Sequence, residues 1–269
     1  MDMSGKLRIE PGTKVSLSRH DPDATPGAKS KESVQAILAR NLATLRELQY
    51  LMYAENKNAL LVVLQGMDAS GKDGTIRHVM SGLNPQGVSV TPFKAPSAEE
   101  LDHDYLWRIH RRVPPRGDIG IFNRSHYEDL LIVRVHRLVD RSDWSRRYDQ
   151  INAFEKMLVE NGITILKFFL HISSEEQKER IQERIDDPDR RWKLSESDFT
   201  ERKFFDDYQK AYEDVLTRCS TPWAPWYIVP ANRKWYRNFA VSEIIEETLK
   251  GLKMKFPRPQ IDLKKFRLE

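Results

Sequence analysis

The sequence has few of the features that mark secreted or membrane proteins. Its single cysteine, Cys219, excludes an intrachain disulfide and suits a reducing compartment. No apolar run reaches the roughly 18 residues that a membrane-spanning helix needs, and the first residues form no apolar signal-peptide core. From these absences we expect a cytoplasmic protein with no membrane partner.

Aromatic residues are missing from the N-terminal part. Every Phe and Trp follows Met52, and Tyr50 alone among the tyrosines precedes it. Residues 1–30 are polar and rich in Gly, Pro, Asp and Lys, so we expect an extended arm with a short strand within 7–17. The whole chain of 269 residues is 39% hydrophobic, which is enough for the core of one large domain.

The charge balance is only slightly positive. The formal net charge is +4 and the isoelectric point is about 9.0. Such a surplus favours a polyanionic partner, but it leaves nucleic acid, nucleotides and inorganic phosphate chains open.

Apolar runs alternate with helical patterns along the chain. We predict strands at 59–65, 88–93, 119–122, 163–172 and 226–230, and helices at 31–55, 97–112, 143–160, 197–218 and 235–252. This alternation predicts an α/β fold with right-handed crossovers and a parallel sheet covered on both faces. In such sheets the ligand lies at the carboxyl ends of the strands.

A glycine-rich loop follows the first predicted strand. Gly66, Gly71 and Lys72 have the spacing of a phosphate-binding P-loop, in which backbone N–H groups and a helix N-terminus surround a phosphate. Asp73 stands where a P-loop normally has Ser or Thr, and Asp68 lies inside the loop. Two acids beside bound phosphate indicate a metal ion held by carboxylates. The alternative is a plain strand-to-helix turn that Asp73 caps.

A second polar segment follows the third predicted strand, where P-loop enzymes place a metal-binding carboxylate. Here the first polar residue is Asn123, and Arg124 next to it can clamp a phosphate. Glu128 and Asp129 are the nearest carboxylates, unless they only cap a helix. His126 is either functional or packed.

Residues 175–210 concentrate charge around Pro188, which interrupts a helical pattern. This arrangement is typical of the movable helical lid of nucleotide kinases, which excludes water from a phosphate site. The alternative is a solvated charged hairpin. The basic residues of this segment are Lys178, Arg180, Arg184, Arg190, Arg191, Lys193, Arg202 and Lys203.

Several sequence blocks together resemble the polyphosphate kinase 2 family. They are residues 66–74 (GMDASGKDG), 122–129 (FNRSHYED), 167–173 (KFFLHIS) and 224–232 (APWYIVPAN), with Asn84-Pro85-x-Gly87 between the first two. The resemblance spans about 45–240. It implies a P-loop kinase-like three-layer α/β/α domain over 1–269, with a parallel five-stranded sheet, an arm at 1–30, a helical lid at about 175–210 and a tail at 253–269.

The resemblance also implies an activity and its cofactor. Family members transfer phosphoryl groups between inorganic polyphosphate and nucleotides with Mg²⁺, for which Mn²⁺ can substitute. Asn123 and Glu128 resemble class III members, which phosphorylate both AMP and ADP. The implied partners are polyphosphate, AMP, ADP, ATP and guanine nucleotides, with no nucleic acid, in a homo-oligomer that is a dimer or tetramer.

Site roles are carried over from the family residue by residue. The implied catalytic residues are Asp68, Lys72, Asn123, Arg124 and Asp129, with Asp68 and Asp129 as metal ligands. The phosphate-binding loop contributes Gly66, Ala69, Ser70, Gly71, Asp73, Gly74 and Thr75. Ser125, Tyr127 and Glu128 would seat the nucleotide, and Lys167, Arg180, Arg184, Lys193 and Arg202 would follow polyphosphate or close the lid.

Two other functions share parts of this pattern. An ATP-dependent nucleoside monophosphate kinase would have the same fold and lid but a different donor. A non-catalytic polyanion-binding protein would use the basic surplus alone, although the acids in the loop hinder plain anion binding.

Overall fold

A five-stranded parallel sheet forms the centre of the computed structural model, which describes residues 2–261. The strand order is β2-β3-β1-β4-β5, with β1 (Ala59–Gln65) in the middle. The others are β2 (Val88–Pro92), β3 (Ile119–Asn123), β4 (Ile163–His171) and β5 (Trp226–Pro230). All seven residues of β1 are buried, because helices cover both faces of the sheet. The predicted parallel sheet is confirmed.

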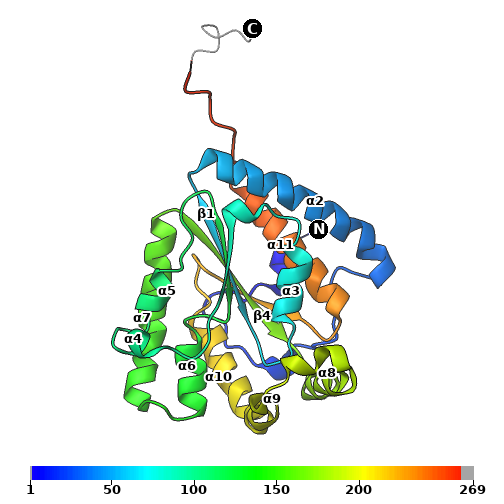
Figure 1. Cartoon of the computed structure of the whole chain (residues 1–269), viewed down its shortest axis with the longest axis vertical. Helices are drawn as coiled ribbons and strands as arrows, with labels where there is room; N and C mark the ends of the chain where they lie inside the picture. Colours follow the sequence, from blue (N-terminus) through cyan, green and yellow to red (C-terminus); the bar gives the residue numbers. More distant parts are fainter. Residues whose placement is uncertain (1, 262–269) are drawn as a thin grey trace.

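Helices pack in two layers on this sheet (Figure 1). One layer contains α2 (Lys31–Glu55), α3 (Lys72–Val79) and α11 (Lys234–Gly251), with α11 packed against both of the others. The opposite layer contains α6 (Glu128–Val135), α7 (Arg141–Glu160) and α10 (Phe205–Arg218). Right-handed crossovers between parallel strands require this distribution. The three-layer α/β/α prediction is therefore confirmed.

Two predicted helices are broken in the structure. The segment 97–112 contains α4 (Ala98–Leu101) and α5 (Trp107–His110) instead of one helix. The predicted cap forms between Ser97 and Glu100, but the Asp104 carboxylate accepts a hydrogen bond from the Leu106 N–H at 3.0 Å. Such a local side-chain bond competes with the helical backbone pattern. The segment 197–218 is likewise divided into α9 (Glu196–Thr200), the 3₁₀ turn η4 (Glu201–Phe204) and α10.

The N-terminal arm is more structured than predicted. It begins with α1 (Met3–Leu7) and contains a 3₁₀ turn, η1 (Leu17–Arg19). Instead of a strand it has a single bridge between Arg8 and Tyr227 on β5. Aliphatic side chains anchor the arm to the core: Met3, Leu7, Ile9, Val15 and Leu17 are buried.

The predicted lid segment contains α8 (Ser174–Asp186) and the 3₁₀ turn η3 (Pro188–Lys193), followed by α9 and η4. Another turn, η2 (Pro85–Gly87), leads into β2. Within the predicted tail, residues 253–261 form neither helix nor strand, and residues 262–269 lie outside the described part. Across residues 2–261, every helix is too short or too polar to cross a membrane.

Candidate active site

The glycine-rich loop leaves β1 at the carboxyl edge of the sheet and enters α3. Its backbone has positive φ at Gly66, Ala69 and Gly71, which turns the chain back on itself. Lys72 Nζ donates to the carbonyl oxygens of Gly66 at 2.8 Å and Met67 at 3.1 Å. Burial, reinforced by the nearby Arg124, lowers the pKa of Lys72 to about 8. The ammonium group is thus held inside the loop where a phosphate would compete for it.

The β3 segment meets this loop side by side. Because Asn123 is in register with Leu64 of β1, its amide reaches Asp73 and donates to Oδ1 at 2.6 Å. Arg124, in a left-handed backbone conformation, donates from Nη2 to Asp68 Oδ1 at 2.5 Å. Each acid of the loop therefore has a partner from the second predicted segment.

Glu128 and Gln65 extend this network. Glu128 Oε2 lies 3.6 Å from Arg124 Nη1, and Gln65 Nε2 donates to Glu128 Oε1 at 3.1 Å. Glu128, and after it Asp68, raises the pKa of Arg124, so the guanidinium stays charged. Sequence reasoning missed Gln65. Its position as the last residue of the central strand, at the carboxyl edge, could have identified it.

Asp129 is held by Arg147 from α7. Arg147 Nη1 donates to Asp129 Oδ1 at 3.1 Å and to its backbone oxygen at 3.0 Å. Burial raises the pKa of Asp129 to about 6, against the opposing effects of Arg147 and Arg108. Neither arginine was singled out from the sequence, since both come from distant segments with no local pattern.

The acids offer part of a metal site. Within residues 2–261, no three Asp, Glu, His or Cys side chains gather as a protein-only metal site would require. Mg²⁺ normally takes only one or two carboxylates and completes its octahedron with water and substrate phosphates. Asp68, a quarter exposed at the rim of the phosphate loop, has the right chemistry for such a shared site.

Arg180 supports the loop from α8. Its Nη1 donates to the carbonyls of Ala69 and Ser70, its Nη2 to those of Ala231 and Asn232, and its Nε to Glu176. These bonds use all five N–H donors of a guanidinium. Arg180 was predicted to follow polyphosphate or to close the lid. In this structure it has no donor left for a ligand, so a polyphosphate contact would require one of these bonds to break.

The position of Lys167 does not fit its predicted contact with polyphosphate. Its side chain is fully buried between β4 and α7, and its three N–H donors go to Glu155 Oε2 at 2.5 Å, Cys219 O at 2.7 Å and the Tyr127 hydroxyl at 2.8 Å. Burial disfavours the Glu155 carboxylate, but Lys167 and His126 outweigh it and hold the pKa of Glu155 below its usual value. Lys167 stabilises the core and does not face a polyphosphate chain.

The same network removes two predicted nucleotide contacts. Tyr127 is fully buried and its hydroxyl donates to Glu155 Oε1 at 2.8 Å. The buried Ser125 Oγ accepts the Tyr127 N–H at 3.2 Å, so it also points away from solvent. His126 lies 3.1 Å from Glu155 and is packed, which decides between the two interpretations of that residue.

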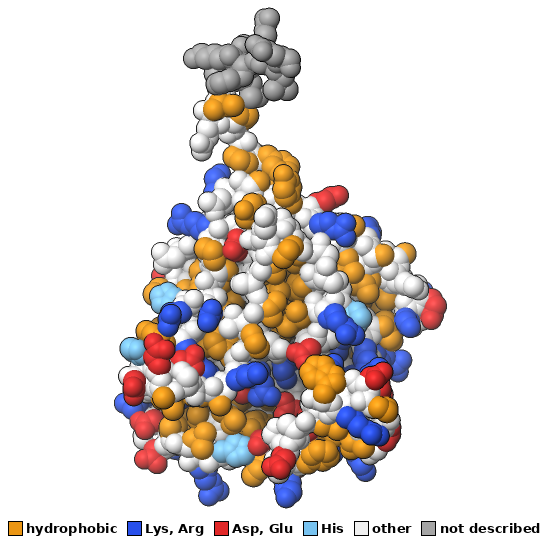
Figure 2. Space-filling view, viewed as in Figure 1, with side chains coloured by type: hydrophobic (Ala, Val, Ile, Leu, Met, Phe, Trp, Pro, Cys, Tyr) orange, Lys and Arg blue, Asp and Glu red, His pale blue; other side chains and the backbone are white. Residues whose placement is uncertain are grey.

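Of the remaining predicted lid residues, Arg184 and Arg202 are hydrogen-bonded within the protein, and Lys193 is exposed. Arg184 pairs with Asp198 at 3.2 Å. Arg202 donates to Gln177 Oε1 at 2.9 Å, and Gln177 in turn donates to the Asp68 carbonyl at 3.0 Å. Lys193 is exposed beside Trp192. Figure 2 shows acidic and basic side chains intermixed over the lower half of the molecule, where α8 and α10 lie in Figure 1.

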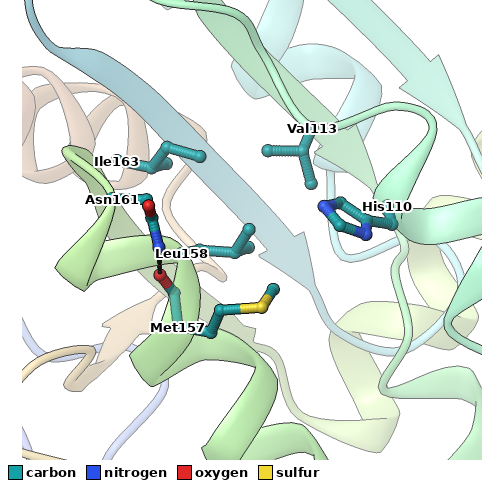
Figure 3. Close-up of a pocket in the computed structure, with 6 residues that line it drawn as sticks. All are labelled: His110, Val113, Met157, Leu158, Asn161 and Ile163. Carbon is teal, nitrogen blue, oxygen red and sulfur yellow. Dashed lines mark hydrogen bonds between the residues drawn. The ribbon is translucent and has the colours of Figure 1, made fainter.

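The pocket in Figure 3 is at a different place. It opens where β4 begins, at the edge of the sheet opposite the glycine-rich loop. His110, Val113, Met157, Leu158, Asn161 and Ile163 line it. With no Lys, Arg, Asp or Glu in this lining, the pocket lacks the groups that phosphate chemistry needs.

Comparisons with known proteins agree with this geometry. A sequence model of the family described as Polyphosphate kinase 2 (PPK2) matches residues 28–257. The AMP/ADP-polyphosphate phosphotransferase of Meiothermus ruber is 50% identical over 98% of this chain and 99% of its own. The ADP-polyphosphate phosphotransferase of Rhodopseudomonas palustris is 46% identical over 94% of this chain and 91% of its own.

A solved structure extends the likeness to the fold. The crystal structure of Polyphosphate Kinase 2 from Arthrobacter aurescens TC1 has a TM-score of 0.95 and 44% identity, covering 98% of this chain and 95% of the other. The P-loop kinase-like fold follows from this match together with the loop geometry. The chain belongs to the polyphosphate kinase 2 family.

Proposed function

We propose that the protein catalyses Mg²⁺-dependent, reversible phosphoryl transfer from inorganic polyphosphate to nucleoside mono- and diphosphates. The observation that carries the proposal is the meeting of Lys72 and the Arg124–Asp68 pair around one glycine-rich loop. The names of the Meiothermus and Rhodopseudomonas relatives support polyphosphate as the donor.

The residues of the site suit a reaction that depends on position and charge. Phosphoryl transfer needs little covalent participation from the protein, so alignment and charge neutralisation supply most of the rate. Lys72 and the loop N–H groups would hold the phosphates next to the transferred group. Arg124 keeps its charge and would neutralise the transferred phosphoryl. Ser70 Oγ is buried without a hydrogen-bond partner among the described residues and would gain one from a phosphate oxygen.

Asp68 and Asp129 would hold Mg²⁺, or Mn²⁺ in its place, together with substrate oxygens. The bound ion would neutralise charge between neighbouring phosphates. Asp68→Asn tests this assignment without an activity assay. We expect it to weaken Mn²⁺ binding at least tenfold in the presence of tripolyphosphate, measured by electron paramagnetic resonance. An unchanged Mn²⁺ affinity would remove Asp68 from the metal site.

The proposed acceptors are AMP and ADP, with guanine nucleotides as further substrates, as in class III of the family. Asn123 and Glu128 support this subclass because both lie at the loop, bonded to Asp73 and Gln65. The Meiothermus relative is named for both adenine acceptors and the Rhodopseudomonas relative for ADP alone. Acceptor range is therefore a separate question from donor identity.

The segment 175–210 is proposed as the lid. Arg202 and Gln177 link this segment to Asp68, so a movement of the lid would displace the glycine-rich loop. Lys193 would contact the polyphosphate chain, since it is exposed on the same segment. Arg184 would add to this contact if closure separates it from Asp198.

A homo-oligomer, dimer or tetramer, is also proposed. Tyr50 and Tyr53 on the long helix α2 are about half exposed, and Phe256 packs near Tyr50 with ring centroids 6.0 Å apart. Light scattering at micromolar concentration that gives the mass of one chain would contradict this proposal.

The activity is tested by incubating pure protein with AMP, Mg²⁺ and long-chain polyphosphate without ATP, and separating the nucleotides. Successive appearance of ADP and ATP supports the donor and both acceptors. ADP alone supports the donor and contradicts the second acceptor. Turnover that appears only when ATP is added would instead identify a nucleoside monophosphate kinase.

A further inference from the structure

A buried arginine lies directly behind the phosphate-binding loop. Arg237, in the first turns of α11, is only 3% exposed. Its Nη1 lies so close to Gly71 that a Cβ on that glycine would overlap it, and a Cβ on Gly74 would lie 3.0 Å from its Nη2. The loop backbone therefore rests on the guanidinium, and residue 71 must be glycine both for this contact and for its φ of 102°.

The partners of this guanidinium are neutral. Nε and Nη2 donate to the Asn238 side-chain oxygen at 3.2 and 2.9 Å, and Nη1 lies 3.5 Å from the Ser70 carbonyl. No Asp or Glu among residues 2–261 forms an ion pair with it. Burial and, after it, the adjacent cation of Arg180 lower the pKa of Arg237 to about 10. A buried charge without a counter-charge is costly, so proteins rarely retain one without a functional reason.

We propose that Arg237 is an electrostatic positioning residue whose missing counter-charge is supplied by the condensed phosphate anion that binds in the loop. This inference rests on the proposed function and adds a residue to it. Arg237 does not touch the ligand, because the loop separates them. Its field acts through the loop backbone, where the low local dielectric preserves it.

The ligand class follows from the charge. Arg180, whose donors are all used by Glu176 and backbone carbonyls, stands next to Arg237, so the floor of the loop carries two guanidiniums and one carboxylate. A condensed phosphate carries adjacent negative charges and gains more from this field than a single phosphate does. Tripolyphosphate is therefore a suitable probe.

The test compares three proteins with wild type. Arg237→Gln removes the charge and keeps a hydrogen-bonding group near Asn238, whereas Arg237→Lys keeps the charge. Lys156→Met is the matched control, because Lys156 is an exposed cation at the far end of α7. Tripolyphosphate affinity is measured by calorimetry, and the melting temperature is measured with and without the ligand.

We expect Arg237→Gln to bind tripolyphosphate at least tenfold more weakly and to lose most of the ligand-induced rise in melting temperature. Without ligand it should melt no lower than wild type, since it no longer buries an uncompensated charge. Arg237→Lys should bind within about threefold of wild type, and Lys156→Met within about twofold. An Arg237→Gln protein that binds normally, or that melts lower while keeping its affinity, would overturn the proposal.

A second measurement keeps the test decisive if Arg237→Gln does not fold. The ammonium in Arg237→Lys is buried next to Arg180 and should lose its proton between pH 7 and 10. The ratio of its tripolyphosphate affinity to that of wild type should then fall with pH, and the titration of Lys72, common to both proteins, cancels in the ratio. A constant ratio would contradict the proposal. Failure of wild type itself to bind tripolyphosphate would instead contradict the proposed function.

Discussion

Two buried cations of this protein, Lys167 and Arg237, have opposite electrostatic surroundings. Lys167 lies between the sheet and α7, where a carboxylate, a hydroxyl and a carbonyl use its three N–H donors. Arg237 lies under the phosphate-binding loop, where an amide and a carbonyl are its only hydrogen-bonding partners within residues 2–261. The first cation is neutralised within the fold. The second remains available to an anion.

This difference separates fold from function. A paired buried charge is strongly stabilising relative to its broken pair, yet the pair as a whole presents almost no net charge to a ligand. An unpaired buried charge costs stability in the free protein and becomes favourable only when an anion arrives. Charged residues near a site are therefore better judged by whether the fold already pairs them with an opposite charge than by their sign alone.

The largest effect is expected when the buried ion pair between Lys167 and Glu155 is broken. Lys167→Met leaves the Glu155 carboxylate buried without its ammonium partner, so we expect the free energy of unfolding to fall by about 3–5 kcal/mol. Urea denaturation measures the loss, and the turnover of the folded fraction should stay within about twofold of wild type. Replacing Glu155 by Leu in the same protein should recover at least half of the stability. A stable single variant with lost activity would place Lys167 in the site after all.

The next largest effect is expected from a substitution in the phosphate-binding loop. Lys72→Ala removes the mobile cation of the loop, and we expect kcat/KM to fall by roughly 10²–10³, as when one preorganised donor to a developing charge is lost. Because the partners of Lys72 within residues 2–261 are loop carbonyls, the far-ultraviolet circular dichroism spectrum should not change. A variant within tenfold of wild-type kcat/KM would exclude Lys72 from the transfer step.

The pH dependence of activity and stability should show the protonation state of Lys72. Burial lowers the pKa of Lys72 from 10.5 to about 8, so kcat/KM should fall about tenfold per pH unit above pH 8. Between pH 8 and 10.5 the unfolded chain binds more protons at Lys72 than the folded protein does, so this group makes the free energy of unfolding rise with pH. Activity and this contribution to stability should thus move in opposite directions. A Lys72→Met protein with the same stability slope would contradict the assignment.

The smallest effect concerns the exposed lid residue. Lys193→Ala should raise the KM for polyphosphate about two- to threefold and leave kcat unchanged, because an exposed charge is screened by solvent and salt. The increase should disappear at high ionic strength. Arg190, which is exposed on the same turn but paired with Asp187, offers a control with a smaller expected change.

The sequence predicted the sheet and the meeting of its two main motifs. Continuous apolar runs identify buried parallel strands, and the topology of such sheets brings the residues after Gln65 and Phe122 to one edge. The direction of a charged side chain is not encoded in the same way. Lys167 interrupts an otherwise apolar run, and that interruption was the available sign of a buried ion pair.

For Arg237 and Arg147, no local sequence pattern indicates a place at the site. Arg237 reaches the loop from a helix that follows the last strand, and Arg147 reaches Asp129 from α7. Only tertiary packing places these guanidiniums. The break within 97–112 depends on one side-chain bond from Asp104, which outweighs a helical pattern that the sequence shows clearly.

The proposed donor at this loop is a condensed phosphate, and radiolabelled polyphosphate distinguishes it from ATP. The protein is incubated with labelled polyphosphate, unlabelled AMP and Mg²⁺, without ATP, beside the Lys72→Ala variant. We predict that the label appears in the β-phosphate of ADP with wild type and is nearly absent with the variant. Label that stays in polyphosphate, while labelled ATP transfers its γ-phosphate to AMP, would contradict polyphosphate as the donor.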